Sequence, residues 1–312
     1  MAPWMASGLI YSSSLALLAG SITIINITTR TFNFAVASMA TFGFYIAFTC
    51  VELYGGYPYQ YYPLVALFGS FLGLVCYFGL NRHLLRRKAA DITLMMSTLG
   101  YDLLLLSFIQ MYVDYLSFTY RLFPRRVTMN IYDFELFGVR AAAIILPIVA
   151  LAFLVTLHIF LTRTKFGIAM RATIENPVLA GASGINSDRV YMVAWIIGGG
   201  MASLGGAFMA MAITGTPVMG MYTIPLMFAG AILGGLNSLY GGMIGGFLIG
   251  VTEYAGVFYL SQRFGPWVQG YRMAIPLMLM AVTLLFFPRG LAGIPLGKVW
   301  RGLTGKKRGA SL

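Results

Sequence analysis

Repeated apolar runs of about 20 residues restrict the fold of this chain more than any other feature. A run of this length is what a helix needs to cross the hydrocarbon core of a bilayer. Because the runs are continuous rather than alternating, they favour membrane-spanning helices over the strands of a β-barrel. Only 10% of the residues are charged, against about 25% in soluble domains. We therefore predict an all-α polytopic membrane protein.

We expect about eight to nine transmembrane helices in one transmembrane domain that covers residues 1–312. The first run has no basic residues before it and is expected to be a retained helix rather than a cleaved signal. The run at 221–236 is the shortest, and a re-entrant segment is an alternative for it. The predicted spans lie at roughly 8–27, 32–51, 61–81, 92–113, 141–161, 190–213, 221–236, 240–260 and 272–288.

The distribution of Lys and Arg sets the orientation of these spans. Alternate connections, together with a basic tail at 289–312, place 15 of the 21 Lys and Arg residues on one side. Cytoplasmic loops are enriched in Lys and Arg, so this side is predicted to be cytoplasmic. The same rule explains the net charge of +12 without nucleic acid as a partner. The basic segments at 162–189 and 289–312 lie on the same side of the membrane only if 221–236 crosses it.

The longest polar interruption near the middle of the chain is residues 162–189, which is rich in helix chemistry. Residues 166–176 can form one short helix of about 16 Å. Asn176 suits an N-cap and Pro177 the first position of a second helix. Gly184 suits the left-handed position after that helix. Two interpretations are open: the contact surface for a cytoplasmic motor, or an ordinary amphipathic loop lying on the membrane.

No constellation typical of a soluble enzyme is present, and no cofactor is expected. The two histidines, His83 and His158, lack metal-ligand spacing, and neither G-x-S-x-G nor H-E-x-x-H occurs. The phosphate loop G-x-x-x-x-G-K-[ST] is also absent from the chain. Any work driven by a nucleotide must therefore come from a partner.

Three polar residues fall within predicted spans and are candidates for a translocation path. Asp102 and Glu253 lie in mid-span, and Asn33 lies at the start of the second span. A charge at the bilayer centre costs at least ~2.5 kcal/mol, so such a residue normally faces a cavity or a partner. The alternative is an acid that is hydrogen-bonded to a neighbouring helix. Two acids used as proton carriers would instead indicate a secondary transporter.

Two further features have alternative interpretations. The long external loop at 114–140 is either a solvated surface loop or a docking site for an external partner. Glycines at 198–200, 205–206 and 241–250 have the small-xxx-small spacing that lets helix backbones approach closely. Close packing is the main interpretation of these glycines, with use as a hinge as the alternative.

Residues 164–186 resemble the cytoplasmic coupling segment of branched-chain amino-acid ABC permeases. The pattern is T-x-x-G-x-A-x-R-A-x-x-E-N-P-x-x-A-x-x-x-G-I-N. Other stretches are similar to the family as well: the Asn-Phe-Ala at 33–35 after the first helix, the glycine-rich run at 229–254, and the closing FFPRGLAG. The matched residues of the coupling segment are Thr164, Gly167, Ala169, Arg171, Ala172, Glu175, Asn176, Pro177, Ala180, Gly184, Ile185 and Asn186.

The resemblance implies a subunit of an ABC importer in the cytoplasmic (inner) membrane. The family's complexes hold two permease subunits, two ATPase subunits and an external solute-binding protein. This chain is more similar to the first permease type than to the second. The ATPase-coupling residues that the resemblance implies are Thr164, Gly167, Arg171, Ala172, Glu175, Asn176 and Gly184.

The chain departs from the family pattern at positions that leave the solute open. Val36 and Ala37 replace the usual His-Gly, Phe44 replaces an Ala, and Asp102 stands in a span that is normally apolar or hydroxylic there. Branched-chain or related amino acids are the favoured solutes, and urea, short amides or a sugar are the alternatives.

The residues of the segment agree with a coupling role. Arg171 and Glu175 are four residues apart and can share one helix face. An apolar set of Phe166, Ile168 and Met170 is expected to fit a groove on the partner.

Overall fold

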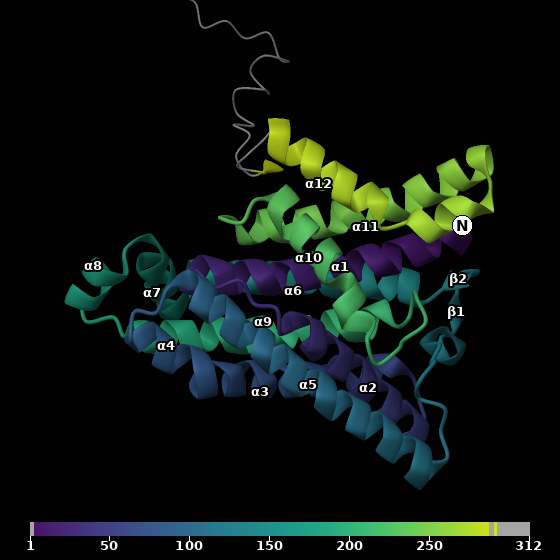
Figure 1. Ribbon diagram of the computed structural model, residues 1–312, viewed down its shortest axis with the longest axis horizontal. Coiled ribbons are helices and arrows are strands. Elements are labelled where there is room, and N and C mark those ends of the chain that lie inside the picture. Colours follow the sequence, from purple (N-terminus) through teal and green to yellow (C-terminus); the bar gives the residue numbers. More distant parts are fainter. Residues whose placement is uncertain (1–2, 287–289, 292–312) are drawn as a thin grey trace, which may run out of the picture.

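The computed structural model describes residues 3–286 and 290–291, and these are almost entirely helical (Figure 1). The predicted basic tail at 289–312 lies outside these residues except for Gly290 and Leu291. The helices are α1 (Pro3–Thr29), α2 (Val36–Tyr54), α3 (Tyr62–Cys76), α4 (Arg82–Arg86), α5 (Asp91–Tyr120), α6 (Ala142–Arg163), α7 (Lys165–Glu175), α8 (Pro177–Ala182), α9 (Ser187–Met209), α10 (Met219–Gly234), α11 (Leu239–Phe264) and α12 (Ala274–Phe286).

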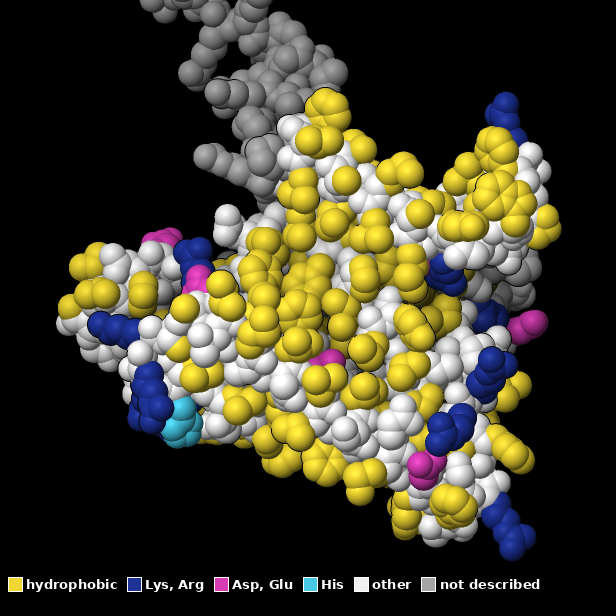
Figure 2. Space-filling view, in the orientation of Figure 1, with side chains coloured by type: hydrophobic (Ala, Val, Ile, Leu, Met, Phe, Trp, Pro, Cys, Tyr) yellow, Lys and Arg dark blue, Asp and Glu magenta, His cyan; other side chains and the backbone are white. Residues whose placement is uncertain are grey.

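Within the described residues, seven helices are long and apolar enough to cross a membrane, and α10 and α12 are shorter apolar helices. One of the seven is continuous from Pro58 to Arg86, because a π-helical turn at Tyr77–Asn81 joins α3 to α4. Figure 2 shows a broad apolar surface between two ends that carry most of the visible Lys and Arg. The prediction of an all-α polytopic membrane protein is confirmed.

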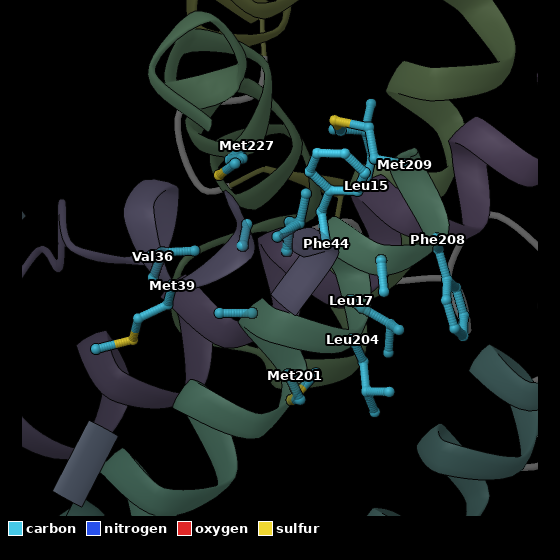
Figure 3. Close-up of a cluster of buried hydrophobic side chains, with 14 of the residues drawn as sticks. Leu15, Leu17, Val36, Met39, Phe44, Met201, Leu204, Phe208, Met209 and Met227 are labelled. Carbon is cyan, nitrogen blue, oxygen red and sulfur yellow. The ribbon is translucent and has the colours of Figure 1, made fainter. Parts of the chain in front are cut away.

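Helix α1 forms the centre of the bundle and is buried along most of its length. It packs between α9 and α11. Its Ser14 and Ser21 hydroxyls donate to the carbonyl oxygens of Gly205 and Gly198, at 2.6 and 2.7 Å. Figure 3 shows the apolar part of this core, in which side chains of α1, α2, α9 and α10 meet.

Glycines let these helices approach closely, as their spacing predicted. A methyl group at Gly206 of α9 would overlap the carbonyl oxygen of Ala40 on α2. A methyl group at Gly234 of α10 would overlap the carbonyl oxygen of Gly241 on α11. The interpretation as close packing is therefore confirmed.

The direction of α9 and α11 settles how the chain passes between them. Helix α1 runs antiparallel to α9, because Ser14 pairs with Gly205 and Ser21 with Gly198. It also runs antiparallel to α11, since Gly8 lies against Tyr254 and Gly20 against Met243. Helices α9 and α11 are thus parallel, so residues 210–238 return along the bundle, as predicted for 221–236. Helix α10 alone is about 24 Å long, and a non-helical stretch precedes it.

Two predicted boundaries differ from the structure in ways that affect the site. The second span was expected to begin at residue 32, but residues 31–33 are extended and the helix begins at Val36. The fourth was expected to end near residue 113, but α5 continues to Tyr120. The external loop therefore starts at residue 121, and it contains an unpredicted hairpin of β1 (Glu135–Leu136) and β2 (Val139–Arg140).

Candidate functional site

Helices α7 and α8 form a two-helix elbow at one end of the bundle (Figure 1). Thr164 caps α7, because its Oγ1 accepts the Gly167 N–H at 2.9 Å. Asn176 caps α8, because its Oδ1 accepts the N–H groups of Val178 and Leu179 at 3.0 and 3.1 Å. Gly184 follows α8 with a φ of 82°, the left-handed conformation expected there. The predicted elbow and its caps are confirmed.

One face of α7 fixes the elbow to the bundle. Gly167, Met170 and Thr173 are spaced three residues apart and are buried. A methyl group at Gly167 would overlap the Phe160 carbonyl oxygen near the end of α6. Helix α7 also contacts α9 and α1. A displacement of α7 would therefore be felt by the long helices of the core.

The opposite side of the elbow is exposed. It presents the charged Arg171 and Glu175, whereas Ala172 is half-buried. Of the expected apolar set, Ile168 is 52% exposed as predicted, but Met170 is only 1% exposed, and the Phe166 ring packs near that of Phe160. Helix α8 supplies the rest of the exposed apolar surface, with Val178 at 79% and Leu179 at 65% exposure. Sequence reasoning missed these two residues because a six-residue helix has too little periodicity to show which face is buried.

The second candidate region is the break between α1 and α2. The residue before α2, Ala35, has no side chain that could cap the helix. Asp102 of α5 takes that role: its Oδ1 accepts the Ser38 N–H at 3.0 Å, and the Ser38 hydroxyl donates to the Asp102 carbonyl oxygen at 3.0 Å. Asp102 lies about 16 Å from the start of α5. Helix α2 therefore begins inside the apolar part of the bundle.

Thr98, one turn before Asp102, hydrogen-bonds to the extended backbone of the same break. Its hydroxyl accepts the Phe34 N–H at 3.3 Å and lies 3.1 Å from the Phe32 carbonyl oxygen. Residues four apart on a helix share a face, so α5 presents Thr98 and Asp102 together. Asp102 is 1% exposed and is hydrogen-bonded to a neighbouring helix, which agrees with the alternative interpretation from the sequence. Its assignment to a translocation path stays a prediction.

Helix α10 begins beside this break and is capped in the same non-local way. The Gly220 N–H in its first turn donates to Thr41 Oγ1 of α2 at 3.0 Å. Gly220 also lies directly against the Ala37 carbonyl. Two helix starts thus meet inside the bundle, and in each a side chain of another helix accepts an N–H of the first turn. Sequence reasoning missed Thr41 and Thr98, because a threonine in an apolar span carries no signal of what it will contact.

The other two path candidates have different surroundings. Asn33 is buried, and its Oδ1 accepts the Ala35 N–H at 3.0 Å, whereas its Nδ2 has no partner among the described residues. Glu253 is 0% exposed and accepts from Arg272 Nε at 2.6 Å. The Arg272 guanidinium also lies 5.3 Å from the Tyr11 ring centroid. The structure brings Asn33 and Asp102 to one break, while Glu253 contacts Tyr11 of α1 and Arg272, which precedes α12.

Within residues 3–286 and 290–291, no group of three His, Cys, Asp or Glu side chains is placed to hold a metal ion. The two cysteines, Cys50 and Cys76, are buried free thiols.

Comparison with known proteins identifies the family. Residues 4–284 match the family described as the permease component of branched-chain amino acid transport systems. The chain is 36% identical over 300 residues to a probable branched-chain amino acid transport permease protein, LivH, of Methanocaldococcus jannaschii, covering 96% of this chain and 95% of that protein.

More distant relatives agree with this match. The chain is 26% identical over 302 residues to BraD of Pseudomonas aeruginosa, covering 93% of this chain and 95% of that protein, and 32% identical over 149 residues to LivH of Escherichia coli K12, covering 47% and 46%. No solved structure matches the chain. These relatives are named as permeases, which makes the chain a transport component rather than an enzyme. The chain belongs to the family of permease components of branched-chain amino acid transport systems.

Proposed function

We propose that this chain is a membrane-spanning permease subunit of an ABC importer that carries branched-chain or related amino acids. Relatives that span the whole chain are named for this transport. An external binding protein delivers the solute, a second permease subunit completes the path, and two partner ATPases hydrolyse ATP. Residues 1–312 act as one transmembrane domain in the cytoplasmic (inner) membrane.

The α7–α8 elbow is the observation that carries this proposal. It is capped at both helix starts, anchored by one buried face of α7, and exposed at Arg171, Glu175, Val178 and Leu179. Such a surface suits a groove on an ATPase that offers both charged and apolar contacts. The ATPases need no covalent chemistry here, because transport requires only that they stabilise two states of the permease differently. The coupling residues Thr164 and Asn176 shape this surface, and Gly167 anchors it.

The external loop provides a second docking surface, which we assign to the binding protein. Phe123, Ile131 and Phe137 are exposed apolar residues in this loop. The loop is anchored to the bundle by Tyr132, which donates a hydrogen bond to Glu52 of α2. Burial and this hydrogen bond raise the pKa of Tyr132 to about 12. Tyr132 thus stays a donor throughout the physiological pH range. The docking alternative for this loop is the one we favour.

Proton-coupled transport through Asp102 and Glu253 is less well supported. Asp102 is engaged with α2, and Glu253 is paired with Arg272. The two acids contact different helices, so they do not form a relay between them.

The proposal is tested by reconstituting the complex with its ATPases and binding protein and measuring ATP-driven uptake. Glu175→Ala removes an exposed charge of the elbow, and Gly167→Trp forces α7 away from α6. We expect both variants to reach the membrane in normal amounts and to lose uptake. Lys165→Ala is the matched control, because Lys165 is also an exposed charge on α7 but lies outside the family pattern. Normal uptake by both variants would refute the assignment, and uptake that needs a proton gradient but no ATP would favour a secondary transporter.

A further inference from the structure

A cavity of about 360 Å³ lies between the end of the α3–α4 helix and the start of α9, next to the elbow. Its walls combine basic and apolar side chains: Arg82, Arg86 and Arg189 with Phe78 and Met192, and a single acid, Asp188. Because the α7–α8 elbow leads directly into α9, this cavity lies at the end of the bundle that we assign to the cytoplasm.

The cavity has more positive than negative charge. Asp188 is shared by two arginines, with Arg86 Nη2 at 2.5 Å and Arg82 Nε at 3.5 Å from the same Oδ2. Arg189 is exposed, and no described residue accepts a hydrogen bond from its guanidinium. Three guanidinium groups therefore face one carboxylate. Guanidinium groups match the oxygens of a phosphate well, since they can donate two parallel hydrogen bonds.

An apolar stripe runs along the helix that leads to this cavity. Five exposed side chains at steps of three or four residues share one helix face. The stripe ends at Phe78, whose ring lies 5.2 Å from the Arg82 guanidinium carbon. Its members are Leu64, Leu67, Phe71, Val75 and Phe78. A surface that is apolar along the span and basic at its end has the polarity of a phospholipid lying in the same leaflet.

We propose that this cavity binds the phosphate of an anionic phospholipid, whose acyl chains lie along the Leu64–Phe78 stripe. The charge excess supplies the preference for an anionic headgroup, and the stripe distinguishes a lipid from a free phosphate ion. Lipid bound here bridges the α3–α4 helix and α9 beside the elbow. The proposal goes beyond solute transport and does not depend on which solute is carried.

The test is native mass spectrometry of the purified full chain, released from detergent that contains either phosphatidylglycerol or phosphatidylcholine. We expect phosphatidylglycerol to stay bound and phosphatidylcholine to dissociate. Arg189→Gln should weaken phosphatidylglycerol binding about fivefold, the contribution of one basic residue near a membrane surface. Because Arg189 has no described partner, this variant should fold normally. Arg87→Gln is the matched control, since Arg87 is an exposed arginine of the same end outside the cavity.

A second variant separates a lipid from a free anion. Phe71→Ser interrupts the stripe and leaves the arginines in place, so it should weaken phosphatidylglycerol binding. Inorganic phosphate added as a competitor should still displace the lipid headgroup from the arginines to the same extent. Equal retention of the two lipids, or no effect of Arg189→Gln, would overturn the proposal. So would inorganic phosphate that binds as tightly as the lipid. Absence of the lipid from the complex assembled with its ATPases would also overturn it, because a protein would then cover the cavity.

Discussion

Two interruptions of the helices, the α7–α8 elbow and the break before α2, each contain an asparagine but are built differently. At the elbow, Asn176 caps α8 through its own neighbours, Val178 and Leu179. At the break before α2, the first turn is capped by Asp102, which lies 64 residues from Ser38 in sequence. The elbow is exposed, whereas the break is buried.

This difference indicates that the elbow serves as an interface for a partner, whereas the break anchors helices to one another. The elbow keeps its shape through local bonds, so it can meet a partner as a preformed unit. The break holds α2, α5 and α10 together, because Asp102 and Thr41 satisfy backbone groups of other helices. An unsatisfied backbone group in an apolar region costs several kcal/mol, so these contacts resist separation. We infer that movement enters at the elbow and that the break keeps the core helices in register.

The largest expected effect follows from removing the non-local cap. Asp102→Leu leaves the Ser38 N–H without an acceptor inside the bundle and should lower the free energy of unfolding by about 1–3 kcal/mol. Asp102→Asn is the control, since its carbonyl oxygen can still accept and the loss should be smaller. Thermal unfolding in detergent measures both. A Leu variant as stable as the parent would show that the cap does not anchor α2.

Glu253 offers a third buried polar contact on which to test the anchor idea. Glu253→Gln and Arg272→Gln should each destabilise the chain by roughly 1 kcal/mol, a figure reduced for the 36% exposure of Arg272. The double variant should be little worse than either single variant, because the two residues act as a pair. We expect Glu253→Gln to impair uptake more than assembly. Additive losses in the double variant would mean that the two residues act separately.

A smaller and local effect is expected at the elbow. Asn176→Ala removes the N-cap of α8, which costs about 1 kcal/mol. This cost should appear as faster amide hydrogen exchange in residues 177–185, with global unfolding almost unchanged. Asn176→Asp keeps an acceptor at this position and should protect those amides. A large drop in global stability with Asn176→Ala would show that the elbow unfolds together with the core. The elbow would then not be the independent local unit that distinguishes it from the break.

The smallest effect on stability should come from the exposed face of α8. Val178→Asp places a charge on a surface side chain and should change the free energy of unfolding by less than about 0.5 kcal/mol. It should nevertheless abolish ATP-driven uptake, because it puts a charge into the proposed apolar contact with the ATPase. Val178→Leu is the matched control and should transport normally. Unchanged uptake in the Asp variant would exclude Val178 from that contact.

The contrast between the two regions also explains what the sequence could predict. The spans, the elbow and its caps are local features: an Asn-Pro pair or a left-handed Gly184 carries its meaning within a few residues. Asp102 was recognised as unusual, but its role depends on Ser38 of another helix. Thr41, Thr98 and Arg272 gave no signal, since their partners are set by packing. Met170 was misplaced because the apolar residues of α7 do not reveal which face meets α6.

Cysteine protection at Val178 directly tests whether the ATPases bind the exposed face of the α7–α8 elbow. The Val178→Cys variant, with Cys50 and Cys76 changed to Ser, is exposed to a membrane-impermeant maleimide in inside-out vesicles. We predict that Val178→Cys is labelled in the permease alone and protected once the ATPases are bound, while the cysteine-free parent stays unlabelled in both. Equal labelling of Val178→Cys with and without the ATPases, or labelling from outside intact cells, would contradict it.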